Sequence, residues 1–386
     1  MYNQYSLLLY NQWNGEVLIL KVGVMLIGAL GCTASTLIYG YYSNKKNKET
    51  LKKGSMWCSV SGDFLPETYD LVFGGWDIQQ TSLTDVVKKY GIVKYSGDIQ
   101  IDLFSPVVGS LDYAHRVENH SVTHDNLTEA IEKVKSDISS FKSKNKLDKV
   151  IVINFSSPMY CGEKDLCGWD STTAYSQAAV SLSADWVEFT PSNSITDDLI
   201  ELAEKSHSRI AGRDGSTGQT ILKLLFRDFL TNKGFSIDGW YSTNIIGNHD
   251  GKVLSHPDYN AEKLLDKKSV LDNVVSENDN HIVEISYYKP SGDNKESWDC
   301  INFSGWLDSE MSLRLNWHGR DSLLASALAL DIITGLIKCD KINYPYGVVN
   351  DLSLCFKNPV NRKSDSYFGQ FSSFCSFVNK ENIVCM

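Results

Sequence analysis

The sequence predicts an α/β protein with a doubly wound parallel sheet and a second, inserted α+β unit. Up to about residue 215, short apolar runs alternate with helical stretches, as βαβ units do. From there to about residue 320, longer alternating segments indicate an antiparallel sheet with one exposed face. From Asp321 the chain is helical again. We therefore expect one domain from residues 1–220, completed by residues 321–386, with residues 221–320 inserted as the other.

Composition narrows the classes of function. The 386 residues carry a net charge of −10, which argues against non-specific nucleic-acid binding, since that needs a basic surface. The nine cysteines are an odd number without a C-x-x-C pair, so we expect reduced cytoplasmic thiols without a zinc or disulfide framework. The eight histidines show no H-E-x-x-H spacing, which argues against a histidine-built metal site.

The N-terminal region resembles a membrane anchor only in composition. Residues 17–42 contain a single charge, Lys21, and are followed by the basic stretch NKKNK. Four glycines and several hydroxyl residues interrupt the run, however. A buried strand, a glycine turn and an apolar helix explain it better than a membrane span.

The strand and helix of this region are typical of a dinucleotide-binding unit. The apolar run VGVMLIG (residues 22–28) leads directly into GALGCTAST. Phosphates would bind at the helix N-terminus around Cys32 to Ser35, where free amides and the helix dipole favour negative charge. The motif is imperfect because Leu30 and Ala34 stand where G-x-G-x-x-G has glycines, so an ordinary strand and helix remain an alternative.

The next predicted strand ends in an acidic residue. In DLVFGGWDI (residues 70–78), Asp77 lies near the carboxyl end of the strand, where open α/β sheets bind ligands. Asp77 could accept a hydrogen bond from a ribose or adenine group. The alternative is a helix cap before SLTDVVKKY.

Further along, a helix over residues 126–143 precedes a buried strand over residues 149–157. The loop GRDGSTGQT (residues 212–220) then opens the helical segment ILKLLFRDFL. Glycines and hydroxyls before a helix N-terminus favour phosphate binding. A capped helix after a flexible turn is the alternative.

Eight motifs in the chain carry a specific resemblance. In order, they are VMLIGALGCTAST, LVFGGWDI, TGQT, WYSTNIIGNHDG, KKSVLDNVV, GDNKESWDCINFSGWL, GRDSLLASALALD and LCFKNP. Between about residue 22 and residue 360 they resemble the myo-inositol-1-phosphate synthase family in its shorter prokaryotic form. The resemblance implies a Rossmann domain that binds NAD, an inserted catalytic domain that also builds a homotetramer, and cyclisation of D-glucose 6-phosphate to 1L-myo-inositol 1-phosphate.

The resemblance also assigns catalytic residues by position. They are four lysines and two acids: Lys263, Lys267, Lys295, Lys357, Asp214 and Asp321. We expect Lys263 and Lys357 to transfer protons and stabilise the oxyanion, and Lys267 and Lys295 to hold substrate oxygens and phosphate. The two acids would orient the lysines.

Ligand-binding residues follow in the same way. Those implied for the cofactor are Gly28, Gly31, Thr33, Ala34, Asp77, Arg116, Ser157, Thr190, Asp250, Asp293 and Ser322. Those implied for the substrate are Thr217, Gly218, Gln219, Thr220 and Asn248. Members of this family can also hold a monovalent or divalent cation near the phosphate, but no ligand cluster in the sequence identifies one.

Some positions depart from the family pattern. They include Leu30 and Ala34 in the nucleotide turn, His249 in GNHDG, and Glu188 before FTPS. These departures leave open a cyclase acting on another sugar phosphate such as fructose 6-phosphate. Two further alternatives are a simple NAD-dependent dehydrogenase and a catalytically inactive NAD-binding protein.

Overall fold

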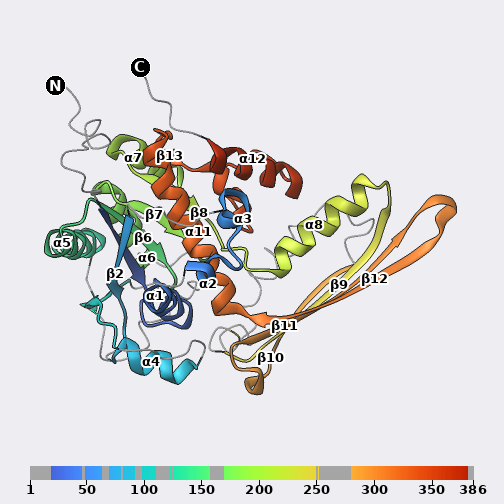
Figure 1. The fold of residues 1–386 in the computed structure, drawn as a ribbon, viewed down its shortest axis with the longest axis horizontal. Helices are drawn as coiled ribbons and strands as arrows, with labels where there is room; N and C mark the ends of the chain where they lie inside the picture. Colours follow the sequence, from blue (N-terminus) through green and yellow to red (C-terminus); the bar gives the residue numbers. More distant parts are fainter. Residues whose placement is uncertain are drawn as a thin grey trace.

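In the computed structural model, the described residues are 19–45, 48–62, 69–79, 81–91, 98–109, 122–123, 126–156, 169–248, 251 and 280–380. They form a layered α/β body from which a second sheet and one helix project (Figure 1). The predicted fold class is confirmed.

The body is built on a seven-stranded sheet in which every pairing is parallel. Its strands, in spatial order, are β13 (Gly347–Val348), β8 (Arg209–Gly212), β7 (Asp185–Glu188), β6 (Lys149–Asn154), β1 (Leu20–Ile27), β2 (Tyr69–Trp76) and β3 (Asp102–Phe104). Chain order runs outward in both directions from β1 and β6. The carboxyl ends of these two strands therefore flank the crevice where doubly wound sheets bind ligands.

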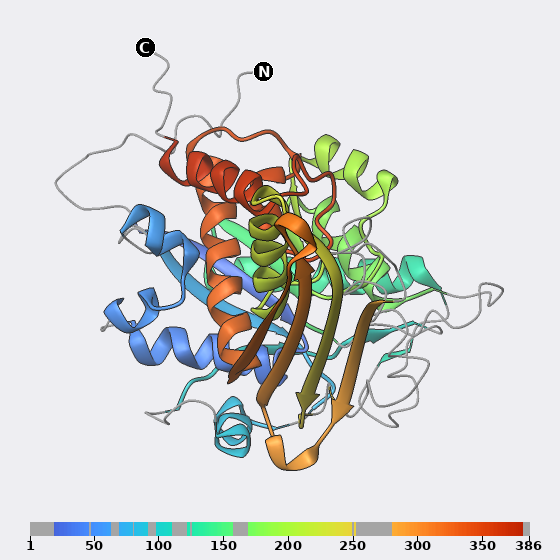
Figure 2. The same ribbon diagram turned by 90° about the vertical axis from the view of Figure 1, so that its right-hand side faces the viewer.

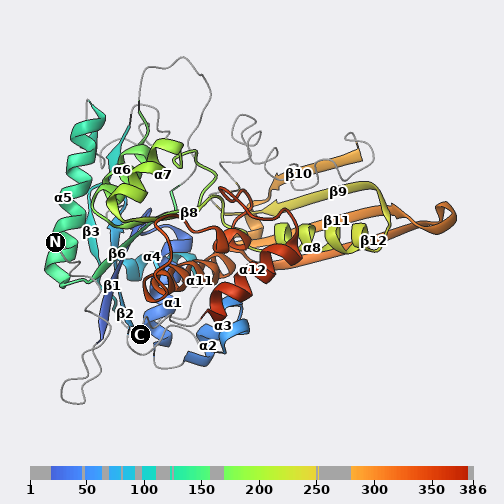
Figure 3. The same ribbon diagram turned by 90° about the horizontal axis from the view of Figure 1, so that it is seen from above.

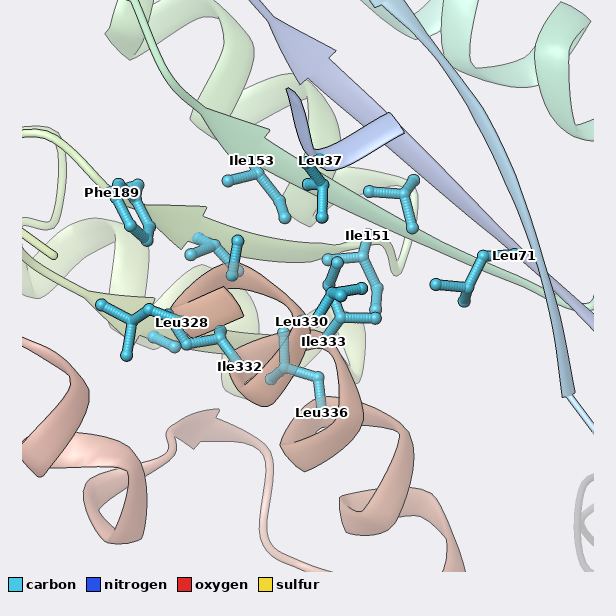
Figure 4. Close-up of a cluster of buried hydrophobic side chains, with 14 of the residues drawn as sticks. Leu37, Leu71, Ile151, Ile153, Phe189, Leu328, Leu330, Ile332, Ile333 and Leu336 are labelled. Atoms are coloured by element: carbon cyan, nitrogen blue, oxygen red, sulfur yellow. The ribbon is translucent and has the colours of Figure 1, made fainter. Parts of the chain in front are cut away.

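Helices cover both faces of this sheet because its strands are apolar on both sides. One layer contains α1 (Cys32–Asn44), α4 (Leu83–Tyr90) and α11 (Asp321–Lys341), with α2 (Lys48–Lys52), α3 (Met56–Ser61) and α12 (Tyr367–Asn379) at its margin. The other contains α5 (Leu127–Asn145), α6 (Ser171–Ser181) and α7 (Asp197–Ser206). Figure 4 shows the first interface, where Ile151 and Ile153 of β6 lie against Leu330 and Ile333 of α11.

The N-terminal prediction of strand, glycine turn and helix is confirmed by β1 and α1. Among the described residues, the helix that is long and apolar enough to cross a membrane is instead α11, near the other end of the chain. Of its most apolar window, 78% is buried inside the protein. This helix is the central core helix of the first layer, where it packs against α1.

The projecting unit is a four-stranded sheet with one helix. The strands, in spatial order, are β10 (His281–Tyr287), β9 (Ser236–Ile246), β11 (Asn294–Ser304) and β12 (Glu310–Arg320). Helix α8 (Gln219–Asn232) lies along one face (Figures 2 and 3). β9, β11 and β12 are antiparallel, as predicted, but β10 runs parallel to β9, so the expectation of a purely antiparallel sheet is wrong. The chain between β9 and β10 must cross over, and alternation of residues does not reveal strand direction.

Short elements complete the fold. They are the paired strands β4 (Val107–Val108) and β5 (Val122–Thr123), and the 3₁₀ turns η3 (Lys289–Ser291), η4 (Trp306–Asp308) and η5 (Asn350–Cys355). After β12 the chain enters α11 directly, and η5 then leads back to residues next to β8. The two sheets therefore meet where α8 and α11 begin.

Candidate functional site

The turn between β1 and α1 has the geometry of a nucleotide-binding turn. Gly28 has φ +78°, which favours glycine, and its amide donates to the carbonyl of Trp76 at 2.9 Å. Helix α1 begins at Cys32, and its N-cap residue, Gly31, has no side chain to cap the helix. The first amides of α1 have no intrahelical acceptor and can bind an anion.

The departures from the glycine motif do not obstruct this turn. Leu30 and Ala34 are fully buried within the core between sheet and helices. The amide of Leu30 donates to Asp77 Oδ2 at 2.7 Å. The turn is thus held by an acid on the neighbouring strand, although its second glycine is missing.

Asp77 directly follows β2, as predicted. Its second oxygen accepts from the amide of Gln79 at 2.7 Å, and burial raises the pKa of its carboxyl despite these bonds. The alternative that Asp77 caps the following helix is wrong, because Ser82 caps α4 by accepting from the amide of Asp85. The contact of Asp77 with a ribose or adenine group stays a prediction.

A second group of cofactor candidates lies where the projecting sheet meets α1. Ser322 Oγ donates to Asp293 Oδ1 at 2.7 Å and lies 3.1 Å from Cys32 Sγ. Asn248 Nδ2 donates to the same carboxylate oxygen at 3.3 Å. The other oxygen, Oδ2, is buried and has no partner within the described part of the chain. Burial, and secondarily the charge of Asp321, raise the pKa of the Asp293 carboxyl. The unpartnered Oδ2 is available to a ligand.

Lys295 pairs with Asp321, and the charge of Lys357 also acts on this carboxylate. Lys295 Nζ lies 3.1 Å from Asp321 Oδ1, which also accepts from Thr217 Oγ1 at 3.0 Å. Burial alone would raise the pKa of the Asp321 carboxyl, but Lys295 and then Lys357 outweigh it and hold this pKa at about 2. The carboxylate is therefore an anion at every physiological pH, stabilised by the charges of both amines.

Backbone pairing brings Lys357 to this position. Lys357 Nζ lies 2.6 Å from Asp214 Oδ1, and the Lys357 amide donates to the Asp214 carbonyl at 2.7 Å. Ser216 donates its amide to Cys355, which extends the pairing. The amide of Asp214 donates to the carbonyl of Thr190 at 3.1 Å. Three segments far apart in the sequence thus fix one amine.

The start of α8 is a polar cradle beside these lysines. Its N-cap residue, Gly218, makes no side-chain cap, and Gln219 and Thr220 form the first turn. Gln219 Nε2 donates to Asp299 of β11 at 2.9 Å. As at α1, the first amides of the helix can bind an anion. The structure therefore places the predicted segment TGQT at a helix N-terminus next to Lys295 and Asp321.

Sequence reasoning missed three buried polar residues near this cradle. Asn244 and Ser297 lie opposite each other on β9 and β11, both almost fully buried. Within the described residues, neither amide atom of Asn244 has a hydrogen-bond partner, and the same holds for the hydroxyls of Ser297 and Ser216. Unpaired buried polar groups are costly and point to a ligand. The available signal was the polar residues at alternate positions of WYSTNII.

Several predicted site residues cannot be placed. Lys263, Lys267, Arg116, Ser157 and Asp250 lie outside the described residues, and so does His249. Their roles stay predictions. Among the residues that are described, no group of three or more His, Cys, Asp or Glu could hold a metal ion, so no cation ligands are assigned.

Thr190 and Glu188 form a buried junction behind the site. Glu188 Oε1 accepts from Thr190 Oγ1 at 2.7 Å and from Asn154 Nδ2 at 2.9 Å, and Oε2 accepts from Ser194 Oγ at 2.6 Å. The Thr190 hydroxyl is thus engaged with Glu188. Burial nevertheless raises the pKa of the Glu188 carboxyl to about 7.

This junction gives a pH prediction. Because the folded pKa of Glu188 lies above its ordinary value, its contribution to stability is fully present below about pH 4.5 and is lost as pH rises through about 7. Glu188→Gln should remove that dependence and cost about 1–3 kcal/mol, since one donor then faces an amide NH₂. The loss of unfolding free energy in Glu188→Gln relative to the wild type, measured by denaturant unfolding, should be larger at pH 5 than at pH 8. Equal losses of unfolding free energy at both pH values would contradict this prediction. So would a similar pH-dependent loss in the control variant Glu204→Gln, on the exposed surface of α7.

The fold and the two helix N-termini define a class: a Rossmann-type, NAD-binding enzyme with a lysine-lined site at the junction of two sheets. Family models described as myo-inositol-1-phosphate synthase match residues 62–164, as the NAD-binding part, and residues 218–322. Together they cover more than half of the chain. The chain belongs to the myo-inositol-1-phosphate synthase family.

Individual relatives of this chain carry names of the same family. The chain is 27% identical over 358 residues to inositol-3-phosphate synthase 1 of Bacteroides thetaiotaomicron, covering 81% of this chain and 83% of that one. It is 28% identical to inositol-3-phosphate synthase 1 of Oryza sativa, covering 81% and 74%. The structure of inositol-3-phosphate synthase from Caenorhabditis elegans matches with a TM-score of 0.79 at 23% identity, covering 96% of this chain and 88% of that one, which supports the same fold.

Proposed function

We propose that this protein is an NAD-dependent isomerising cyclase that converts D-glucose 6-phosphate to 1L-myo-inositol 1-phosphate. The observation that carries the proposal is that Lys295 pairs with Asp321 and Lys357 pairs with Asp214, with the charges of both lysines acting on Asp321, between the nucleotide turn of α1 and the cradle of α8. Such a site can hold a phosphate and a dinucleotide while amines face the sugar between them.

The residues around the nucleotide turn fit NAD. Backbone amides at the start of α1 suit a pyrophosphate, and the unpaired Asp293 oxygen can accept from a ligand. When bound, NAD would supply reversible hydride transfer, with oxidation at carbon 5 of the sugar and later reduction of the ring ketone, so the net redox change would be zero.

The protein's own groups supply positions and protons. The α8 cradle and Lys295 hold the phosphate end of the sugar, and Asp321 keeps Lys295 in place. Lys357, fixed by Asp214, moves a proton at the reacting hydroxyl and stabilises the oxyanion formed during enolisation and aldol closure. Lys263 and Lys267 would contribute the remaining amines.

One assay separates this function from its alternatives. Purified protein is incubated with NAD and glucose 6-phosphate, and products are analysed by chromatography and phosphorus NMR. Inositol phosphate without NADH accumulation is expected. Steady NADH accumulation would identify a simple dehydrogenase, product from fructose 6-phosphate alone would identify a related cyclase, and no product from either sugar would reject catalysis.

We also propose a cytoplasmic homotetramer. The face of the projecting sheet opposite α8 exposes Tyr241, Ile282 and Trp298, and the β11–β12 hairpin tip exposes Trp306 and Leu307, at 86% and 78%. An apolar surface of this kind supports self-association. The six cysteines of the described residues are free thiols, in keeping with a reducing compartment.

The oligomer is tested by light scattering. The wild type should have four times the mass of one chain, and Trp298→Asp should lower that mass because it places a charge in the interface. Ser140→Asp, at an exposed position of α5 on the body and away from the projecting sheet, serves as a control. A wild-type mass of one chain would contradict the proposal.

A further inference from the structure

Helix α8 itself carries a buried lysine, one helical turn after the residues that form the cradle. Lys223 follows Gln219 by four residues, so both side chains lie on the same helix face. Lys223 is 3% exposed, and its amine has no hydrogen-bond partner within the described part of the chain. The ring of Trp240 lies 5.9 Å from the amine. A buried amine left without an acceptor is costly and calls for a function.

Asp299, the anion whose charge acts on Lys223, already accepts hydrogen bonds from other residues. It accepts from Gln219 at 2.9 Å, from Trp240 Nε1 at 2.8 Å and from Ser242 Oγ at 2.6 Å. Asp299 therefore acts on Lys223 through its charge and not through a hydrogen bond. It also fixes the side chain of Gln219, the first residue of α8.

Other charges near α8 face elsewhere. Asp228, further along the helix, accepts from Ser366 Oγ and from the amide of Tyr367 at the start of α12. Arg227 pairs with Asp228 on that same side. Among the described residues, Asp299 is the charged group that acts on Lys223 from the sheet. Burial lowers the pKa of the Lys223 amine to about 8, and Asp299 partly opposes this.

We propose that Lys223 is an internal cation that strengthens binding of the substrate's phosphate at the start of α8. The inference rests on the function proposed above, because it takes the α8 cradle as the phosphate site. Four residues of helix span about 6 Å along the axis. Helical side chains lean toward the N-terminus of their helix, and protein rather than water surrounds this amine, so its charge attracts a dianion bound at the start of α8. Lys223 is then a positioning residue that sets affinity without touching the sugar, and phosphate binding weakens as it loses its proton.

The test uses NAD-loaded protein and D-glucose 6-phosphate, with binding measured by calorimetry from pH 7 to pH 9. A phosphate ester is already a dianion in this range, since its second pKa is about 6. For the wild type, Kd should rise about tenfold across the range, with a midpoint near pH 8. Lys223→Met should bind about tenfold more weakly at pH 7, with a Kd that no longer depends on pH, and its KM should change more than its kcat.

Two controls keep the outcomes distinct. Lys233→Met, at the exposed end of α8, should behave as the wild type. NAD affinity and Tm show whether Lys223→Met is folded. If Lys223→Met is not folded, the dependence of the wild-type Kd on pH decides the test. A Kd that does not change with pH then overturns the inference, and a tenfold rise supports it. Identical profiles for Lys223→Met and the wild type would overturn this inference alone. If the wild type neither binds nor converts the sugar phosphate, the proposed function falls and the inference falls with it.

Discussion

Lys357→Ala is expected to lower turnover of glucose 6-phosphate by at least about a hundredfold, with NAD binding largely intact. Lys357 is held by Asp214 and its side chain is mostly buried, so its amine is fixed within the site and is not a mobile surface charge. Loss of a proton-transfer or oxyanion group has effects of this size. Steady-state kinetics gives kcat and KM, and fluorescence titration gives NAD affinity.

A matched control lies six residues further along. Lys363 pairs with Asp351 and its side chain is 54% exposed. Lys363→Ala should therefore leave kcat unchanged, since exposed ion pairs contribute little. Near-normal turnover of Lys357→Ala would remove Lys357 from the chemistry.

Asp321→Asn is expected to reduce kcat/KM by about a hundredfold, because it removes the anion that pairs with Lys295 and is influenced by the charge of Lys357. Asparagine keeps the size of the side chain and can still accept from Thr217, so the loss reports on charge. Lys295 would no longer be held, and KM should rise together with the fall in kcat.

Asp365→Asn is the control for this second variant. Asp365 is 73% exposed and pairs with Arg362 on the surface. Its kinetics should match the wild type. If Asp321→Asn kept its kcat/KM within about threefold of the wild type, electrostatic organisation of the lysines by Asp321 would be refuted.

Local features of the fold could be predicted from the sequence. The apolar run of β1, the glycines after it and the helix that follows are contiguous, so a single window contains the whole signal. Asp77 was placed correctly at the end of β2 for the same reason. The parallel pairing of β10 with β9 could not be read in this way, since strand direction depends on the connection.

Parts of the site depend on contacts between distant segments. Asp214 and Lys357 are 143 residues apart, and their pairing follows from the backbone contacts around them. The resemblance assigned both residues, but the sequence does not show that they meet. Asn244 was missed because alternation in a strand does not say which set of residues faces inward. Lys223 was missed because a lysine in a helix is usually exposed.

The central claim is that the sugar is oxidised and reduced by one bound cofactor while lysines of the site carry the protons. Glucose 6-phosphate deuterated at carbon 5, incubated with the protein and unlabelled NAD, tests this by mass spectrometry. The predicted result is inositol phosphate that retains the deuterium over many turnovers, with no labelled NADH in solution. Inositol phosphate without the label, or labelled NADH released in proportion to turnover, would contradict it.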